Sequence, residues 1–76
     1  MILVESNSTP SLRLFINDEL FIDQTLSSNI VEIKPKVNAD IVKITVENTG
    51  DTPFTANNTV VEPASTENLK INNTNG

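Results

Sequence analysis

The sequence contains neither cysteine nor histidine among its 76 residues. Without cysteine no disulfide can staple the fold, and without either residue the usual ligands of zinc, haem and iron–sulfur clusters are missing. A chain of this length buries only about 60% of the surface that its unfolded form exposes, so its core is small. We therefore expect a protein without metal or cofactor, stabilised by strand packing or by association with other chains.

Basic and aromatic residues are also scarce. The five basic residues are scattered, the net charge is −5, and the aromatic residues are three phenylalanines with no tyrosine or tryptophan. Nucleic-acid-binding proteins present a basic surface, commonly with aromatic side chains on which bases stack. An acidic chain is likewise a poor ligand for an anionic membrane surface. Neither nucleic acid nor membrane is therefore expected as a partner.

Catalytic chemistry has little to build on in this sequence. Histidine, the commonest general base, is absent, so a serine or threonine nucleophile lacks its usual activating partner. The two glycines, Gly50 and Gly76, cannot form a glycine-rich phosphate cradle. Acidic residues such as Asp18, Glu19 and Asp51 fall in expected turns, and no segment has the ligand spacing of a calcium loop. We expect a non-enzymatic protein with no catalytic, metal-binding or cofactor-binding residue and no small-molecule substrate.

Long hydrophobic runs are missing as well. The apolar residues 1–4 are followed at once by Glu5, which leaves a run far shorter than the apolar core of a signal peptide. No window approaches the length of a membrane span. We expect synthesis without a signal peptide.

The best-defined element that is present covers residues 40–54. Its apolar residues recur at every second position; they are Val42, Ile44 and Val46. This alternation is typical of a strand with one face in the core and one face in water. The Asn-Thr-Gly-Asp run at residues 48–51 predicts a turn, in which Gly50 supplies the positive φ of a tight reversal. We expect the three apolar side chains to lie at the centre of the core.

A hairpin is predicted over residues 12–24, where two similar apolar runs flank Asn17-Asp18-Glu19. A two-residue turn would pair Ile16 with Glu19 and Arg13 with Ile22, which mixes apolar and charged residues on each face. A three-residue loop pairs like with like or opposite charges: its pairs are Ile16–Leu20, Phe15–Phe21, Leu14–Ile22 and Arg13–Asp23. We expect this second register. The core residues that it predicts are Leu14, Ile16, Leu20 and Ile22.

Further short strands are predicted between turns rich in proline and asparagine; they cover residues 2–5, 30–34, 53–55, 59–62 and 69–71. Residues 65–67 have the form of a helix start, but too few residues follow to bury a helical face. Six or seven short antiparallel strands indicate an all-β fold, either a small β-sandwich or a small β-barrel. The chain, 1–76, is then a single domain with an N-terminal arm (1–11) and a polar C-terminal tail (72–76).

The segment from Ile41 to Pro53 combines an alternating strand, the Asn-x-Gly-Asp turn and a following proline. In this it resembles a stretch of immunoglobulin-like β-sandwich domains of the bacterial surface-repeat and phage-virion type. The resemblance implies a small immunoglobulin-like sandwich with this strand in the middle of a sheet. Because the chain lacks the core tryptophan and the cysteine pair of antibody domains and is shorter than their roughly 100 residues, a reduced sandwich is implied. No function transfers with the fold.

The class that remains is protein binding. Ile2, Leu3 and Val4 lie outside the main set of strands, so they are candidates for adding to a sheet edge of this chain or of a neighbour. An ordinary first strand explains them equally well, because a sandwich also needs its edges covered. Phe54, next to Pro53, is a further candidate contact, with core filling as the alternative.

Together these inferences favour a structural protein of a larger assembly. The leading hypothesis is a phage or virus capsid decoration (cement) protein, located on the virion, that binds the shell through its termini and sheet edges. Its acidic outer face would keep the particle soluble. The alternatives are a cell-surface adhesion module from a longer chain and a small protein inhibitor that acts by edge-strand pairing.

Overall fold

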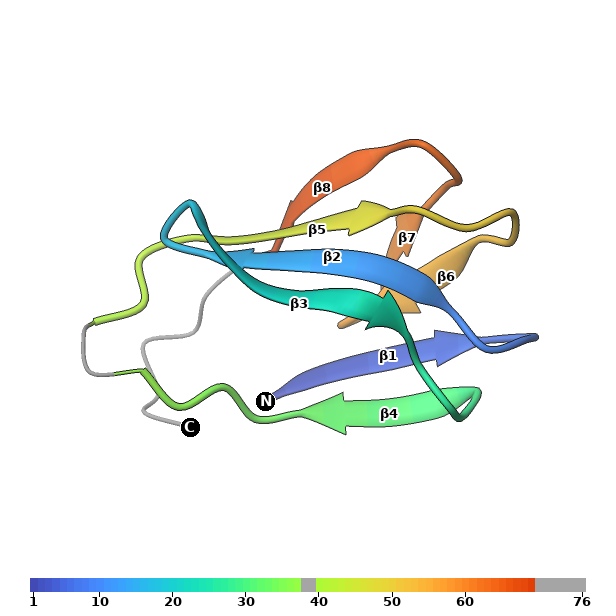
Figure 1. Ribbon diagram of the computed structural model, residues 1–76, viewed down its shortest axis with the longest axis horizontal. Helices are drawn as coiled ribbons and strands as arrows, with labels where there is room; N and C mark the ends of the chain where they lie inside the picture. Colours follow the sequence, from blue (N-terminus) through green and yellow to red (C-terminus); the bar gives the residue numbers. More distant parts are fainter. Residues whose placement is uncertain (38–39, 70–76) are drawn as a thin grey trace.

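The computed structural model describes residues 1–37 and 40–69, which form two four-stranded antiparallel sheets packed against each other (Figure 1). Sheet A contains, in spatial order, β4 (Ile30–Ile33), β1 (Ile2–Ser6), β6 (Phe54–Ala56) and β7 (Thr59–Val61). Sheet B contains β3 (Glu19–Thr25), β2 (Ser11–Ile16), β5 (Ile44–Asn48) and β8 (Thr66–Leu69). The sheets do not close into a barrel. The fold is therefore the predicted small β-sandwich, with eight strands in the described ranges instead of six or seven.

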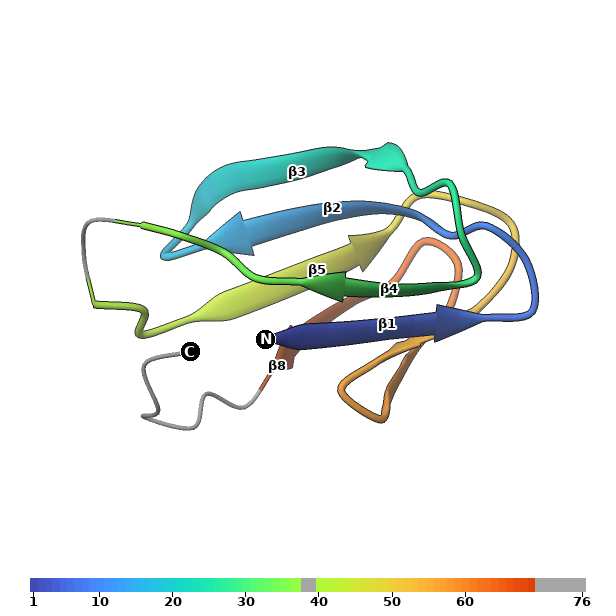
Figure 2. The ribbon, with the colours of Figure 1, turned by 90° about the horizontal axis from the view of Figure 1, so that it is seen from below.

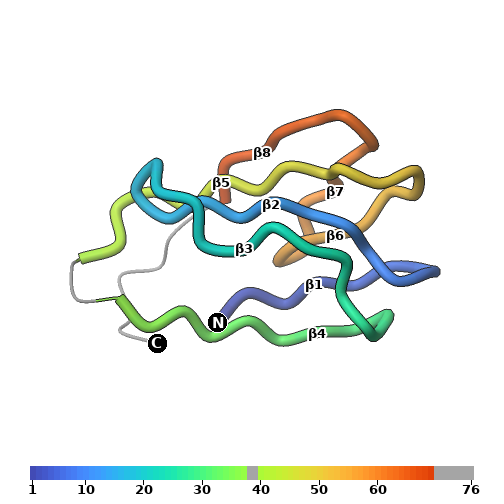
Figure 3. Tube along the Cα trace, in the orientation of Figure 1, coloured from blue at the N-terminus to red at the C-terminus, as the bar shows by residue number. Residues whose placement is uncertain are grey.

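The chain crosses between the sheets five times, as the tube in Figure 3 allows the reader to follow. In constant-type immunoglobulin domains the first, second, fourth and fifth strands share one sheet. Here β1 shares its sheet with β4, β6 and β7, so the strands are divided between the sheets differently.

The middle position expected for the strand of residues 40–54 is confirmed, because β5 lies between β2 and β8. The described residues form no helix, and hence no helix that could cross a membrane.

The core lies between the sheets and consists of alternating residues from both. Its buried members are Ile2, Val4, Leu12, Leu14, Leu26, Ile33, Ile44, Val46, Phe54, Ala56, Val61 and Leu69. Each large aliphatic side chain buried in this way contributes about 1.5–3 kcal/mol of transfer free energy. Of the predicted core residues, Leu14, Ile16, Ile44 and Val46 are buried, and Ile22 is half-buried against the cluster.

The β2–β3 hairpin differs from the predicted register near its turn. Ile16 pairs with Glu19 across a two-residue turn, because Asn17 and Asp18 both adopt positive φ, as a hairpin of this length requires. A β-bulge in β3 then inserts one extra residue, so that the predicted Leu14–Ile22 and Arg13–Asp23 pairs are restored further along. The predicted Ile16–Leu20 and Phe15–Phe21 pairs are wrong.

Two predicted core residues are exposed instead. Leu20 pairs with Phe15 on the outer face of sheet B, because the short turn shifts it by one position, and it is 54% exposed. Val42 is 76% exposed, since β5 begins only at Ile44 and the backbone before it is bound by a side chain of the β2–β3 turn. Alternation in the sequence did not reveal where the strand starts.

Five of the eleven residues of the predicted N-terminal arm, Ile2–Ser6, form an internal strand. β1 pairs with β4 on one side and with β6 on the other, so residues 2–6 leave no free edge. Residues 11–16 form β2, and Pro10 between the two strands is buried. The predicted polar tail, residues 72–76, and the last two residues of the strand predicted at 69–71 lie outside the described residues.

Candidate interaction surface

The residues that the sequence singled out for binding are not available to a partner. Ile2 and Val4 are 1% exposed and Phe54 is 2% exposed, and all three belong to the core. Leu3 is half-buried, and both its backbone N–H and its carbonyl are bound by Asn57. The interaction role predicted for these residues is therefore wrong. The apolar run at the start of the chain forms a strand inside sheet A. Phe54 fills the core, which was the alternative given for it.

A different set of apolar side chains reaches the solvent. We call one end of the sandwich the loop end, defined as Met1 with residues 17–21, 34–37 and 40–43; it lies at the left in Figures 1 and 2. Among the described residues, seven large hydrophobic side chains are exposed, and five of them belong to the loop end: Met1, Leu20, Phe21, Val37 and Val42. The other two, Ile30 and Val60, stand on the edge strands β4 and β7. The exposed apolar surface is thus concentrated at one end.

Asn17 holds the backbone of the loop end in place. Its side-chain Nδ2 donates to the Asp40 carbonyl at 2.8 Å, and its Oδ1 accepts from the backbone N–H groups of Val42 and Lys43 at 2.8 and 3.1 Å. Its own N–H donates to the Lys43 carbonyl at 2.9 Å. These bonds fix the backbone of residues 40–43 against the hairpin turn. Val42 is therefore exposed on a backbone that is held in one position.

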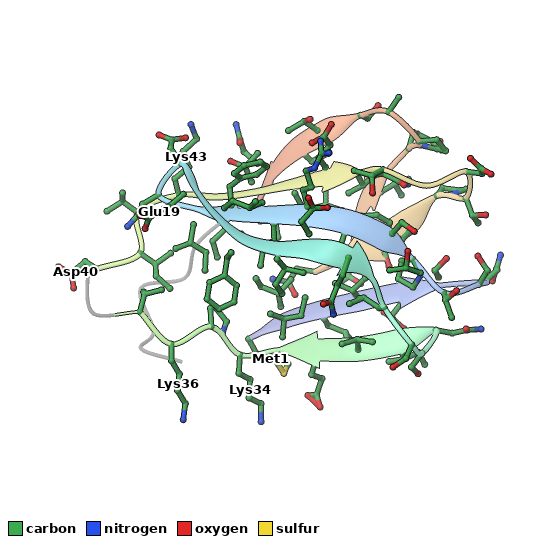
Figure 4. The ribbon with its side chains drawn as sticks, viewed as in Figure 1. Met1, Glu19, Lys34, Lys36, Asp40 and Lys43 are labelled. Carbon is green, nitrogen blue, oxygen red and sulfur yellow. The ribbon has the colours of Figure 1, made fainter. Side chains whose placement is uncertain are left out.

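Charged groups flank these apolar residues on opposite edges of the loop end. Figure 4 places Glu19 and Lys43 toward its upper edge, Lys34 and Lys36 toward its lower edge, and Asp40 at the tip. Lys43 Nζ lies 2.9 Å from a carboxylate oxygen of Asp18. Within the described residues no ion pair includes Glu19, Lys34, Lys36 or Asp40. The loop end therefore carries two cations and two anions without an ionic partner in the described chain.

The opposite end, the turn end, is formed by residues 7–10, 26–29, 49–53 and 62–65, at the right in Figures 1 and 2. These four turns contain two acidic residues, Asp51 and Glu62, no basic residue, and none of the exposed large hydrophobic side chains. Their centre is Asn48, which is 1% exposed. Its Nδ2 donates to the carbonyls of Thr52 and Val61, and its Oδ1 accepts from the Gly50 N–H, each at 2.9 Å. This one side chain joins β5 of sheet B to β7 of sheet A.

The turn predicted at residues 48–51 is thus present, with a different role for its glycine. Gly50 has no positive φ. A Cβ atom at this position would lie 3.2 Å from the Cβ of Ser11, so the absence of a side chain permits a close approach of β2. The Asn48 side chain accepts from the backbone N–H two residues on, the local bond by which asparagine favours turns.

A row of charges crosses the outer face of sheet B between the two ends. Arg13 lies 3.3 Å from Asp23 and 3.4 Å from Glu47, and these are its register partners on β3 and β5. The hydrogen bond and the charge of Asp23, reinforced by Glu47, raise the pKa of the Arg13 guanidinium above its ordinary value. The row is partly exposed, so solvent weakens each pair.

In residues 1–37 and 40–69, no three His, Cys, Asp or Glu side chains gather closely enough to hold a metal ion. Comparison of the chain with protein-family models, with curated proteins and with solved structures finds no match.

The surface that distinguishes the molecule is the loop end, which the sequence patterns had divided between core and turn. The one signal that would have revealed part of it is Asn17-Asp18, since both residue types tolerate positive φ and so favour a two-residue turn.

Proposed function

We propose that this chain is a non-enzymatic structural protein that binds other proteins within a larger assembly, and specifically that it decorates a phage or virus capsid. The observation that carries the proposal is the loop end. Its exposed apolar side chains include Leu20, which is 54% exposed, and Val42, which is 76% exposed on backbone bound by the Asn17 side chain. Apolar side chains gathered on a preorganised surface favour binding, because little conformational entropy is lost when a partner covers them.

The shape and the charge of the molecule are suited to this role. The sandwich measures 32 × 19 × 19 Å, with the apolar end on its long axis. A subunit of this form can meet an assembly with one end while its acidic turn end faces water and limits aggregation of particles. The proposed partner is a protein shell and the proposed location is the virion.

The test is to look for the protein on particles. Virus particles from a host that carries the gene are banded by density, and an antibody raised against the purified protein measures its amount in the particle band. A decoration protein is present in a fixed ratio to the major shell protein, and particles that lack it release their genome at a lower temperature. Absence from the particle band would contradict the proposal. Recovery on the cell envelope instead would support the adhesion module.

A small inhibitor that acts by edge-strand pairing is a second candidate, favoured by β3. This strand is the longest in the described chain, with seven residues, and pairs only with β2, so its other edge is open. An extended partner segment can add to such an edge through backbone hydrogen bonds. Asp23→Pro would block a strand at this edge without touching the loop end. Loss of particle binding in Asp23→Pro with no loss in Val42→Asp would favour edge pairing.

A further inference from the structure

We propose that the loop end is self-complementary and joins two copies of this chain about a two-fold axis, end to end. The inference does not depend on the identity of the shell, but it concerns the same surface as the proposed function, so a second copy and a shell compete for the loop end. It rests on the arrangement of the unpaired charges of the loop end around its exposed apolar side chains (Figure 4).

An interface between identical copies must match itself after a two-fold rotation. The unpaired cations Lys34 and Lys36 lie toward one edge of the loop end, and the anion Glu19 lies toward the other, with Asp40 at the tip. A two-fold axis along the viewing direction of Figure 4 sets the upper edge of one copy against the lower edge of the other. The two lysines of each copy then lie toward Glu19 of its partner, while Asp40, at the tip, lies close to the same residue of the partner.

Four exposed apolar residues of the loop end are neighbours in sequence of these charged residues or of Lys43. Leu20 and Phe21 follow Glu19 directly, Val37 follows Lys36, and Val42 precedes Lys43. The rotation therefore brings the two loop ends, each with its exposed apolar side chains, into one contact. An apolar centre with a charged rim is the usual composition of a protein–protein interface.

The alternative occupants fit these observations less well. An anionic membrane would meet Glu19 and Asp40 together with the two lysines, in a chain of net charge −5. The turn end of a second copy offers Asp51 and Glu62 to the lysines, but its turns expose no large hydrophobic side chain against which Val42 can be buried. Pairing of loop end with loop end offers Glu19 to the lysines of the partner and gives the exposed apolar side chains an apolar surface to cover them.

The contact is expected to be weak in dilute solution. The sandwich has a cross-section of 19 × 19 Å, and an end of this size buries about 350 Å² per copy, below the ~800 Å² of a standard stable interface. We expect a dissociation constant of about 0.1 mM.

Sedimentation equilibrium tests the proposal without any other partner. At low ionic strength and protein concentrations from about 10 µM to 1 mM, the average mass rises from 8.3 kDa toward twice that value. Val42→Asp abolishes the rise, because it buries an unpaired charge in the apolar centre. Val60→Asp is the matched control: Val60 is 55% exposed but lies on β7, so this variant associates like the wild type.

Charge reversal identifies the two edges. Glu19→Lys makes both edges basic, and the double variant Lys34→Glu with Lys36→Glu makes both acidic, so each alone associates about tenfold more weakly. When the two variants are mixed, association with each other is restored. Urea titration of each variant checks that the fold is intact.

A constant mass of one chain up to about 1 mM, roughly ten times the expected dissociation constant, overturns the proposal. Association that Val60→Asp removes and Val42→Asp leaves intact overturns it as well, and so does a mixture of the charge variants that fails to associate. A monomer that floats with phosphatidylcholine–phosphatidylserine vesicles would assign the loop end to a membrane surface instead.

Discussion

The two ends of this sandwich are each organised by one asparagine, and the comparison separates stability from recognition. At the turn end, Asn48 is 1% exposed and joins the two sheets through its side chain. At the loop end, half-buried Asn17 binds the backbone of residues 40–43 beside solvent-exposed apolar groups. The same type of side chain therefore joins the two sheets at one end of the sandwich and holds an exposed surface in place at the other.

The difference follows from how easily water can replace each asparagine. The partners of Asn48 include the carbonyl of Val61, a fully buried residue, where an unsatisfied polar group is costly. The partners of Asn17 belong to exposed residues, where water substitutes for a lost bond. The turn end should therefore determine stability, and the loop end should determine binding.

The largest expected effect is that of Asn48→Ala. It leaves two carbonyls and one N–H without partners and should cost about 3 kcal/mol, a large share of the ~4–11 kcal/mol expected for a domain of this size. Urea unfolding followed by circular dichroism measures the loss. Asn7→Ala, at an exposed residue of the same end, is the control and should leave the urea midpoint unchanged. Equal midpoints for the two variants would remove the distinction between the ends.

Asn17→Gly is the corresponding change at the loop end. Glycine accepts the φ of 52° at this position, so the variant removes the side-chain bonds with little backbone strain. The expected loss of stability is about 1 kcal/mol, while association should weaken about tenfold, because Val42 is no longer preorganised. Urea titration and sedimentation of the same sample measure both quantities. A loss of stability as large as that of Asn48→Ala would refute the proposed division between the ends.

Ala64→Gly should stabilise the turn end. Ala64 has a φ of 64°, a left-handed conformation that disfavours residues with a Cβ atom, and its N–H donates to the Asn48 carbonyl. Relief of this strain should raise the free energy of unfolding by about 0.5–1 kcal/mol, after the greater freedom of glycine in the unfolded chain is counted. Ala64→Val, which keeps the strain and adds bulk, should lower it. Thermal unfolding distinguishes the two.

The smallest expected effect is that of Arg13→Gln on the outer face of sheet B, between the ends. Asp23 raises the pKa of Arg13, so the arginine stays charged up to that raised pKa and its pairing is lost only as the pH rises through it. The variant should therefore differ from the wild type by less than the other three, by an amount constant across neutral pH. In about 0.5 M salt the difference should disappear, because the pairs are exposed and screened. A difference that persists in salt would indicate that packing of the arginine stem contributes.

Much of the fold could be predicted from local patterns. Alternation located β2 and β5. An asparagine-rich turn was expected between the strands predicted at 53–55 and 59–62, and Asn57 and Asn58 have positive φ there. The candidate surface could not be predicted in this way. Leu20 and Val42 have the spacing of core residues, and their exposure results from a bulge in β3 and from the side chain of Asn17. The apolar patterns around Leu20 and Val42 show neither the bulge nor the bonds of Asn17.

The sequence by itself determined that this chain is all-β, because alternation and turn chemistry act within a few residues. It also excluded disulfides and any ligand from cysteine or histidine, since neither residue type is present. Only the tertiary structure decided that β1 lies inside a sheet, that Asn48 closes one end, and that exposed apolar groups gather at the other. Those outcomes depend on pairings between residues as distant as Leu3 and Asn57. Backbone N–H and C=O groups are the same in almost every residue, so the sequence of one strand does not say which strand it pairs with. The pairing is decided when all strands compete for the same sheet edges and the same core.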